Sequence, residues 1–501
     1  MNIKEAKEEI KKSVQIYLDK DAFGRYTIPV SHQRPVFMVG APGIGKTAIM
    51  QQIASELDVA LVSYSMTHHT RQSALGLPVI QEMDYDGGHA LVSEYTMSEI
   101  IAAIYRVMEE SGKREGILFL DEINCVSETL APAMLLFLQY KVFGNRPVPQ
   151  GWVVVTAGNP PQYNKSVKEF DVATLDRLKR IDVTEDFPVW KQYAYGQGIH
   201  GAVITFLEIN QQWFYSIRTT ADGVEYVTAR GWEDLSAAMK LYEKKKFPID
   251  RRLIGQYITD TEIARKFELY YDLYQKYKSD YQIADILSGN YGEDMGERSR
   301  KARMDERFSL LGLLLEKLNE GFRMSVRQEH GLQMVAKALR SVKKMLGQDS
   351  VPLPVLLRQQ AEEQRQQLKE RNAANSVTGR EEEEYLIAVH MLEDYQDIPE
   401  TGDRKKDFEK LKKQFGREVK KHEKQCGEVG AMLEAAFSFI QEVWGNNQEM
   451  VFFLTELTAG TDSLLFINQW GCEAYFAYNQ ELLVYDRDER LAGEIRALLE
   501  L

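Results

Sequence analysis

A glycine-rich segment near the N-terminus carries the residue types that bind phosphate groups. It follows directly on the apolar run Val36–Val39, and a stretch with helical spacing comes after it at 48–54. The segment consists of Gly40, Ala41, Pro42, Gly43, Ile44, Gly45, Lys46 and Thr47. Glycines let the backbone turn tightly and direct its N–H groups at phosphate oxygens, while the start of the helix adds a partial positive charge. We therefore expect Lys46 to contact the β- and γ-phosphates of a nucleotide and Thr47 to hold a Mg²⁺ ion.

Two adjacent acids end a second apolar run. Ile117–Leu120 is followed by Asp121 and Glu122, as expected for a central strand that delivers them to the carboxyl edge of a parallel sheet. There Asp121 would contact the Mg²⁺ ion, and Glu122 would polarise the water that attacks the γ-phosphate. Taken alone, the pair could also be solvated acids at a strand end. Together with the glycine-rich segment upstream, it predicts that the chain binds and hydrolyses a nucleoside triphosphate.

Short apolar runs bounded by glycine and proline crowd into the N-terminal part of the chain, up to about position 185. Four of them, rich in Val, Ile and Phe, lie at Pro35–Val39, Val59–Tyr64, Ile117–Leu120 and Trp152–Thr156. Longer stretches with helical spacing separate them, which is typical of buried parallel strands alternating with helices. From about residue 186 to residue 290 the strand signal disappears and helical periodicity takes over. We predict a parallel sheet flanked by helices, followed by an all-α region.

The 501 residues divide into four parts by composition. The expected division is an α/β nucleotide-binding core with a short N-terminal helix at 1–185, an α-helical lid at 186–290, an extended charged helical region at 291–430, and a small acidic helical module at 431–501. Residues 301–430 carry 25 basic and 23 acidic side chains, a pattern that indicates long, solvated helices. Positions 431–501 carry 3 basic and 12 acidic side chains with many aromatics, which predicts a module with a core of its own.

The overall composition excludes several classes of protein. The formal net charge is −13, so non-specific electrostatic binding to nucleic acid or anionic lipid is not expected. Three cysteines without a CxxC pair fit a reducing compartment and disfavour a zinc ribbon. The start of the chain lacks the apolar core of a signal peptide, and no apolar run approaches the length of a membrane-spanning helix. We therefore expect a cytoplasmic protein.

Several motifs in order resemble those of the AAA+ ATPases, and more narrowly of the MoxR-like group. Besides the glycine-rich segment and the strand that ends in Asp121-Glu122, they are Val153–Pro161, Leu175–Leu178 and Thr228–Glu233. The likeness runs from about Val14 to Asp285, over half of the chain. It implies a P-loop AAA+ core with an all-α lid and, after it, a long and mainly helical C-terminal extension.

The resemblance also implies roles for three further residues. Asn159 matches the sensor asparagine, which would sit between the two acids and help to hold the attacking water. Arg177 matches the arginine finger, which acts on the nucleotide of a neighbouring subunit, with Arg180 as the alternative. Arg230 matches the arginine at the start of a lid helix that contacts the γ-phosphate. The nucleotide that it contacts could be bound to its own subunit or to a neighbouring one. There the chain reads Thr-Ala-Arg, where MoxR-like proteins commonly read Ser-Pro-Arg.

A β-hairpin is expected between the second strand and a helix near Met97–Glu110. Two short extended runs, Val79–Met83 and His89–Tyr95, flank the turn sequence at residues 84–88, Asp-Tyr-Asp-Gly-Gly. In the resembling family such a hairpin points into the pore of a ring. The alternative is a surface hairpin without substrate contact.

The leading functional hypothesis is an ATP-hydrolysing machine that remodels or assembles a protein client. The resemblance implies a homo-oligomeric ring, most often a hexamer, and a partner with a von Willebrand factor A domain. One alternative is a nucleic-acid-linked NTPase, such as the nucleotide-hydrolysing subunit of a McrB-type restriction system. A second is a scaffold switched by ATP occupancy with little turnover. The negative net charge disfavours the nucleic-acid-linked NTPase. The joint presence of Asp121, Glu122 and Asn159 predicts turnover and so disfavours the scaffold switch.

Overall fold

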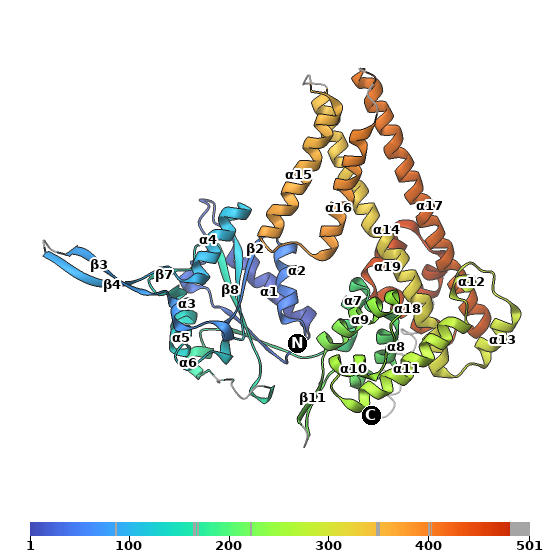
Figure 1. Ribbon diagram of the computed structural model, residues 1–501, viewed down its shortest axis with the longest axis horizontal. Coiled ribbons are helices and arrows are strands. Elements are labelled where there is room, and N and C mark those ends of the chain that lie inside the picture. The colour runs from blue at the N-terminus through green and yellow to red at the C-terminus, as the bar shows by residue number, and fades with distance from the viewer. Residues whose placement is uncertain are drawn as a thin grey trace, which may run out of the picture. The chain divides into compact units, whose positions relative to one another are not determined.

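The computed structural model of the chain describes residues 1–85, 88–163, 167, 170–220, 223–346, 351–398, 401 and 403–480. These residues form two compact units (Figure 1). Unit 1 comprises Met1–Asp186 and Arg358–His390, and unit 2 comprises Phe187–Leu357 and the chain from Met391 onward. Each unit is described by itself below. The predicted division into four domains stays a prediction.

Unit 1 is built on a five-stranded parallel sheet in the order β2-β5-β8-β1-β9. Its strands are β1 (Val36–Gly40), β2 (Ala60–Ser65), β5 (Gly116–Asp121), β8 (Trp152–Gly158) and β9 (Lys179–Val183). The first four coincide with the predicted apolar runs, which confirms the α/β core. The three inner strands, β5, β8 and β1, are buried almost throughout, as apolar runs without alternation predict.

The fifth strand, β9, escaped prediction. In its sequence, KRIDV, only Ile181 and Val183 are buried, whereas Arg180 and Asp182 are exposed. Because β9 lies at the edge of the sheet, charged side chains can alternate with apolar ones. The strand therefore lacks the continuous apolar run that marks the inner strands.

Helices cover both faces of the sheet (Figure 1). The helices of unit 1 that precede residue 187 are α1 (Ile3–Tyr17), α2 (Lys46–Glu56), α3 (Arg71–Leu75), α4 (Glu99–Ser111), α5 (Ala131–Tyr140) and α6 (Val172–Leu175). Residues of α3, α4 and α5 form one hydrophobic cluster with Phe37, Leu118 and Val154. On the other face, α1 and α2 bury Ile10, Val14, Ile49, Met50 and Ile53.

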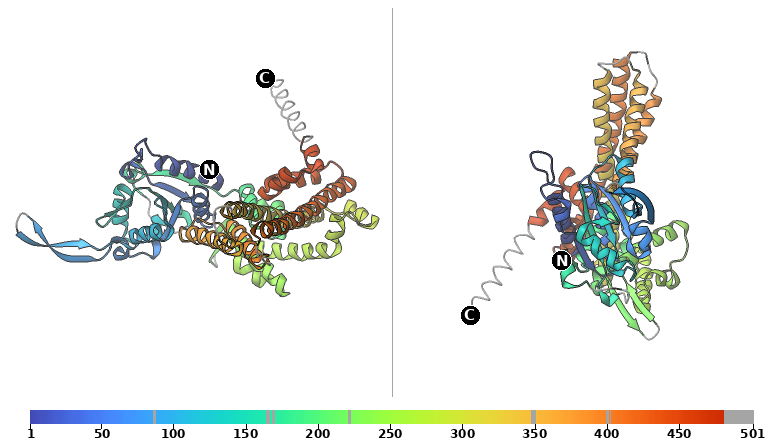
Figure 2. Two further views of the ribbon diagram at one scale, coloured as in Figure 1. Left: turned by 90° about the horizontal axis from the view of Figure 1, so that it is seen from above. Right: turned by 90° about the vertical axis from the view of Figure 1, so that its left-hand side faces the viewer.

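The expected hairpin is present. Its strands β3 (Pro78–Tyr85) and β4 (Gly88–Tyr95) pair antiparallel over eight residue pairs. Residues 86 and 87 of the predicted turn lie outside the described residues. The hairpin extends away from the sheet as a long two-stranded arm (Figure 2). A second, much shorter hairpin, β6 (Val142–Phe143) and β7 (Arg146–Pro147), lies at the base of this arm, where Gly144 of its turn approaches Tyr95.

Unit 2 is almost entirely helical. Up to residue 346 its helices are α7 (Phe187–Gln197), α8 (Gly201–Ile209), α9 (Ala229–Lys245), α10 (Arg251–Tyr257), α11 (Thr261–Asp280), α12 (Ile283–Leu287), α13 (Glu293–Lys301) and α14 (Met304–Leu346). The prediction that 186–290 contains no strands is wrong, because β10 (Ser216–Thr220) and β11 (Gly223–Val227) form an antiparallel hairpin. Three positions of β11 are exposed and only Val227 is buried, so neither an apolar run nor a regular alternation marks it.

Long helices make up the C-terminal region, as expected. They are α15 (Leu353–Ala373), α16 (Gly379–Asp394) and α17 (Arg404–Trp444), followed by the shorter α18 (Gln448–Ala459) and α19 (Thr461–Trp470). The aromatic residues expected to form a separate C-terminal core instead share one. Phe437, Phe453 and Phe466 lie in the same hydrophobic cluster as Leu310 and Phe322 of α14. Residues 481–501 of the predicted terminal module lie outside the described residues.

Within the described ranges, no single helix is both long and apolar enough to cross a membrane. The bent pair α18 and α19, which meet at 92°, passes that test jointly by length and composition alone. Several residues of both helices are buried inside unit 2, among them Phe453, Leu457 and Phe466.

Candidate functional site

The glycine-rich segment connects β1 to the first residue of α2, as predicted. Gly45 adopts a φ of 94°, and a Cβ added there would meet nothing within 4 Å. Glycine is therefore required by the left-handed backbone conformation and not by lack of space. Gly45, the N-cap residue of α2, has no side chain that could cap the helix. The first-turn N–H groups have no partner within the helix itself and are suited to bind an anion.

Lys46 is buried within this loop, with 7% of its surface exposed. Its Nζ donates hydrogen bonds to the carbonyl oxygens of Gly40 (2.7 Å) and Ala41 (2.8 Å) and to Oδ1 of Asn159 (2.9 Å). These three acceptors are neutral oxygens, and together they orient the ammonium group. A buried cation held in this way is suited to bind an anion such as a phosphate group.

Thr47 and Asp121 lie together, as the prediction of a shared Mg²⁺ ion requires. Thr47 Oγ1 donates a hydrogen bond of 2.8 Å to Asp121 Oδ2, and Asp121 Oδ1 accepts one of 2.9 Å from the N–H of Glu122. Hydroxyl and carboxylate oxygens are the ligands that Mg²⁺ prefers, usually with water and substrate phosphates completing its octahedral shell. The two side chains therefore fit a Mg²⁺ ion, which when bound would offset phosphate charge.

Glu122 has a strained backbone and a fixed side chain. Its φ of 56° and ψ of 34° lie in the left-handed region, which is uncommon for glutamate and is often found at functional sites. Its Oε2 accepts hydrogen bonds from Ser65 Oγ (2.9 Å) and Thr67 Oγ1 (2.8 Å). The carboxylate is thus oriented by two hydroxyl groups of another chain segment.

Neither hydroxyl residue was predicted from the sequence. Ser65 ends β2 and pairs in register with Asp121 on the adjacent strand β5. Because the carboxyl ends of parallel strands meet at one edge, a polar residue directly after the run Val59–Tyr64 was the signal that could have identified Ser65.

Asn159 follows β8 and is clamped by a second residue that sequence reasoning missed. Asn124 Nδ2 donates to the carbonyl oxygen of Asn159 (2.8 Å), and Asn124 Oδ1 accepts from the N–H of Asn159 (3.3 Å). A Cβ added at Gly158 would collide with this amide group. The clamp holds Asn159 where its Oδ1 meets Lys46.

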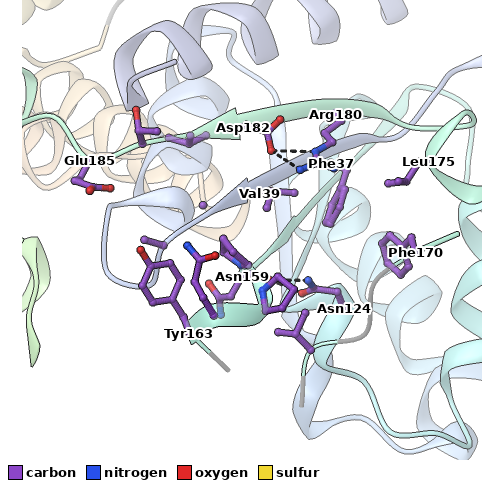
Figure 3. Close-up of a pocket in the computed structure, with 18 residues that line it drawn as sticks. Phe37, Val39, Asn124, Asn159, Tyr163, Phe170, Leu175, Arg180, Asp182 and Glu185 are labelled. Atoms are coloured by element: carbon purple, nitrogen blue, oxygen red, sulfur yellow. Dashed lines mark hydrogen bonds and ion pairs between the residues drawn. The ribbon is translucent and has the colours of Figure 1, made fainter. Parts of the chain in front are cut away.

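A cavity of about 510 Å³ opens beside the loop (Figure 3). Gly40, Ala41 and Asn159 line one part of it, and the apolar side chains of Phe37, Val39, Phe170 and Leu175 line another. Small-molecule sites typically measure some 300–1,000 Å³. The cavity is large enough for a small ligand and borders Gly40, Ala41 and Asn159, whose oxygens bind Lys46. Lys46, Thr47, Asp121 and Glu122 themselves do not line it.

The two arginine-finger candidates differ in their surroundings. Arg180 lines the cavity, and its guanidinium group donates to Asp182 Oδ1 at 2.8 and 2.9 Å (Figure 3). Arg177 is exposed, and its guanidinium group forms no hydrogen bond or ion pair with the part of the chain that the structure describes. The structure thus brings neither arginine onto Lys46, Asp121 or Glu122.

Arg230 lies in unit 2, in the first turn of α9. Thr228 caps this helix by accepting a hydrogen bond from the N–H of Gly231 (3.1 Å), so the helix begins regularly without the proline of the resembling family. The Arg230 side chain is exposed. Its predicted contact with the nucleotide stays a prediction.

A comparison with known protein families identifies the domain. The family model described as AAA domain (dynein-related subfamily) matches residues 35–178. These residues form an AAA domain. AAA domains in general bind ATP, typically with Mg²⁺, and hydrolyse it, and the dynein-related subfamily includes the MoxR-like ATPases. This family match covers less than a third of the chain. A search of curated proteins with the whole chain found no match.

Lys46→Ala should raise the dissociation constant for ATP by about 100-fold or more, because the phosphates lose a buried cation. Titration with a fluorescent ATP analogue measures this affinity, and a thermal melt checks that the variant is folded. Lys12→Ala, which removes a surface ammonium group paired with Glu9, is the control. Wild-type affinity in folded Lys46→Ala protein would contradict the assignment of the loop.

Proposed function

We propose that this chain is a MoxR-like ATPase whose subunits assemble into a ring and use ATP hydrolysis to remodel or assemble a protein client. One observation carries the proposal. Lys46 lies 2.9 Å from Asn159, and Thr47 lies 2.8 Å from Asp121, so three motifs that are far apart in the sequence converge at one sheet edge. This is the edge at which open α/β sheets bind ligands.

The proposed roles follow from this arrangement. Lys46 and the loop N–H groups hold the phosphates, and Thr47 and Asp121 hold Mg²⁺. Glu122 accepts the proton of the attacking water, and its two hydroxyl partners keep the carboxylate oriented for that task. Asn159, fixed by Asn124, helps to hold the same water.

A ring is proposed because the charge that develops during phosphoryl transfer needs a cation, and an arginine is the usual one. Both arginine side chains are exposed. Arg180 is engaged by Asp182, whereas no ion pair ties Arg177 to the described part of its own chain, so Arg177 is available to a second subunit. Exposed apolar side chains on α5 and α6 support association, among them Leu136 and Tyr140 at 58% and Val172 at 83%. By resemblance we propose a hexamer.

The client is proposed to be a protein. The β3–β4 arm exposes Ile80 (71%) and Leu91 (76%), apolar side chains suited to contact a polypeptide. The net charge of −13 does not favour nucleic acid. A von Willebrand factor A domain is the partner that the resemblance suggests.

The test combines two measurements on the purified chain. Phosphate release is followed at several protein concentrations, and the mass of the assembly is determined with and without ATP. We expect ATP-dependent assembly and a turnover per subunit that rises with protein concentration. A strictly monomeric protein that hydrolyses ATP at full rate would refute the ring, and a ring without phosphate release would favour the ATP-occupancy switch.

A further inference from the structure

The loop between α15 and α16 is buried against the AAA domain, although loops normally run over the surface. It comprises residues 374–378, far beyond the end of that domain in the sequence. Ala374, Ser376 and Val377 are at most 5% exposed, and Ala374 belongs to the hydrophobic cluster of the sheet. Figure 1 shows these ends of α15 and α16 beside α2.

This loop binds the free edge of the sheet at one residue, Leu61. Strand β2 is an edge strand, so it presents N–H and C=O groups that no neighbouring strand pairs. At Leu61 both groups are satisfied by the loop. The Leu61 N–H donates to the carbonyl oxygen of Ala374 (2.8 Å), and Asn375 Nδ2 donates to the carbonyl oxygen of Leu61 (3.1 Å).

Asn375 is suited to this position by its backbone as well as its side chain. Its φ of 50° lies in the left-handed region, which glycine and asparagine adopt more readily than other residues. Glycine would tolerate the conformation but would supply no donor for Leu61. Asparagine satisfies both requirements.

The same loop and the first turn of α16 also hold α2. Gln51 Nε2 donates to the carbonyl oxygen of Val377 (2.6 Å), and Ser55 Oγ donates to Glu381 Oε2 (2.7 Å). The Glu381 carboxylate also accepts hydrogen bonds from Arg371 and Thr378, both at 2.8 Å. The contacts therefore form a connected polar network between the loop and the helix.

Both contacted elements lead into the hydrolysis site. Gln51 lies one turn, about 6 Å, along α2 from Thr47. Leu61 lies four residues, about 13 Å, before Ser65 along β2. Ser65, the last residue of β2, and Thr67, two residues beyond the end of the strand, are the hydroxyl residues that hold Glu122.

We propose that Asn375 is a positioning residue for ATP hydrolysis, which holds β2 in place and thereby orients the carboxylate of Glu122 through Ser65 and Thr67. The inference rests on the proposed ATPase function.

Asn375→Asp tests the proposal, because it keeps the shape of the side chain but replaces the donor with an acceptor that repels the Leu61 carbonyl oxygen. We expect kcat to fall about tenfold, while KM and the dissociation constant for ATP change less than about twofold. Hydrogen exchange in the protein without nucleotide should rise within residues 60–65. Asn375→Gly retains the left-handed backbone and should give the same split between kcat and KM, in case Asn375→Asp does not fold. Gln366→Glu, the same type of change at an exposed site of α15, is the control.

A second set of variants tests the route. In a Ser65→Ala/Thr67→Ala background, Asn375→Asp should lower kcat no further, because the link to Glu122 is already gone. If Asn375→Asp lowers kcat in this background by the same factor as in the wild type, the proposed route is overturned. The inference is also overturned if Asn375→Asp alone weakens ATP binding as much as it lowers kcat. An unchanged kcat together with faster hydrogen exchange in β2 would overturn it as well. Absence of phosphate release from the wild-type protein would instead overturn the proposed function, and the inference with it.

Discussion

Replacing Arg177 with alanine is expected to lower the turnover number of ATP hydrolysis about 1,000-fold or more, the range in which arginine fingers act. ATP binding by a single subunit should be unchanged, because the Arg177 guanidinium group contacts nothing around Lys46 in its own chain, as far as the structure describes it. The developing charge on the transferred phosphoryl group would lose its cation. Steady-state phosphate release measures the turnover, and equilibrium titration measures the affinity.

The matched control is Arg180→Ala, three residues away. Its guanidinium group is engaged by Asp182, so the loss in turnover should be much smaller. Mixing separates action within a subunit from action between subunits. Arg177→Ala protein retains Glu122, and Glu122→Gln protein retains Arg177, so mixed rings contain some complete sites. If mixing restores no activity, the finger does not act across a subunit boundary.

Glu122→Gln should bind ATP normally and lower kcat by some 10²–10⁴-fold, since an amide cannot accept the proton of the attacking water. The variant should fold as the wild type does. A glutamine side chain keeps an oxygen that accepts hydrogen bonds from Ser65 and Thr67. Single-turnover hydrolysis measures the chemical step, and the mass of the assembly with ATP shows whether rings accumulate.

Glu110→Gln, the same substitution at an exposed position of α4, should leave turnover unchanged. Wild-type turnover in Glu122→Gln protein would remove Glu122 from the role of general base. If the variant stalls as expected, proteins retained by its ATP-bound form are candidate clients.

The sheet was predictable because its inner strands are buried on both faces and therefore read as continuous apolar runs. The edge strand β9 was not, since Lys179, Arg180 and Asp182 interrupt its apolar residues. The hairpin β10–β11 was missed for a similar reason, as most of β11 is exposed. Hydrophobic periodicity reflects the burial of side chains, and too few side chains of β9 and β11 are buried to give a recognisable pattern.

The residues of the candidate site also differ in whether they could be predicted from the sequence. Gly40–Thr47 and Asp121-Glu122 are local motifs, in which a turn, a helix start or a strand end fixes the chemistry within a few residues. Such local order can be recognised from residue types alone. Ser65 and Asn124 act through contacts with residues 35 to 57 positions away, so their roles appear only when strands lie side by side.

The glycine-rich loop, the two acids and the α/β core were therefore predictable from the order of residues, because each depends on the identity and spacing of near neighbours. The contacts that hold these groups in position became visible only in the folded chain. Asn375 lies 314 residues from Leu61, and no pattern along the chain indicates that its amide binds the edge strand there. Such a contact depends on how distant segments pack, and a polar residue in a loop has the same sequence signature whether it meets solvent or a strand.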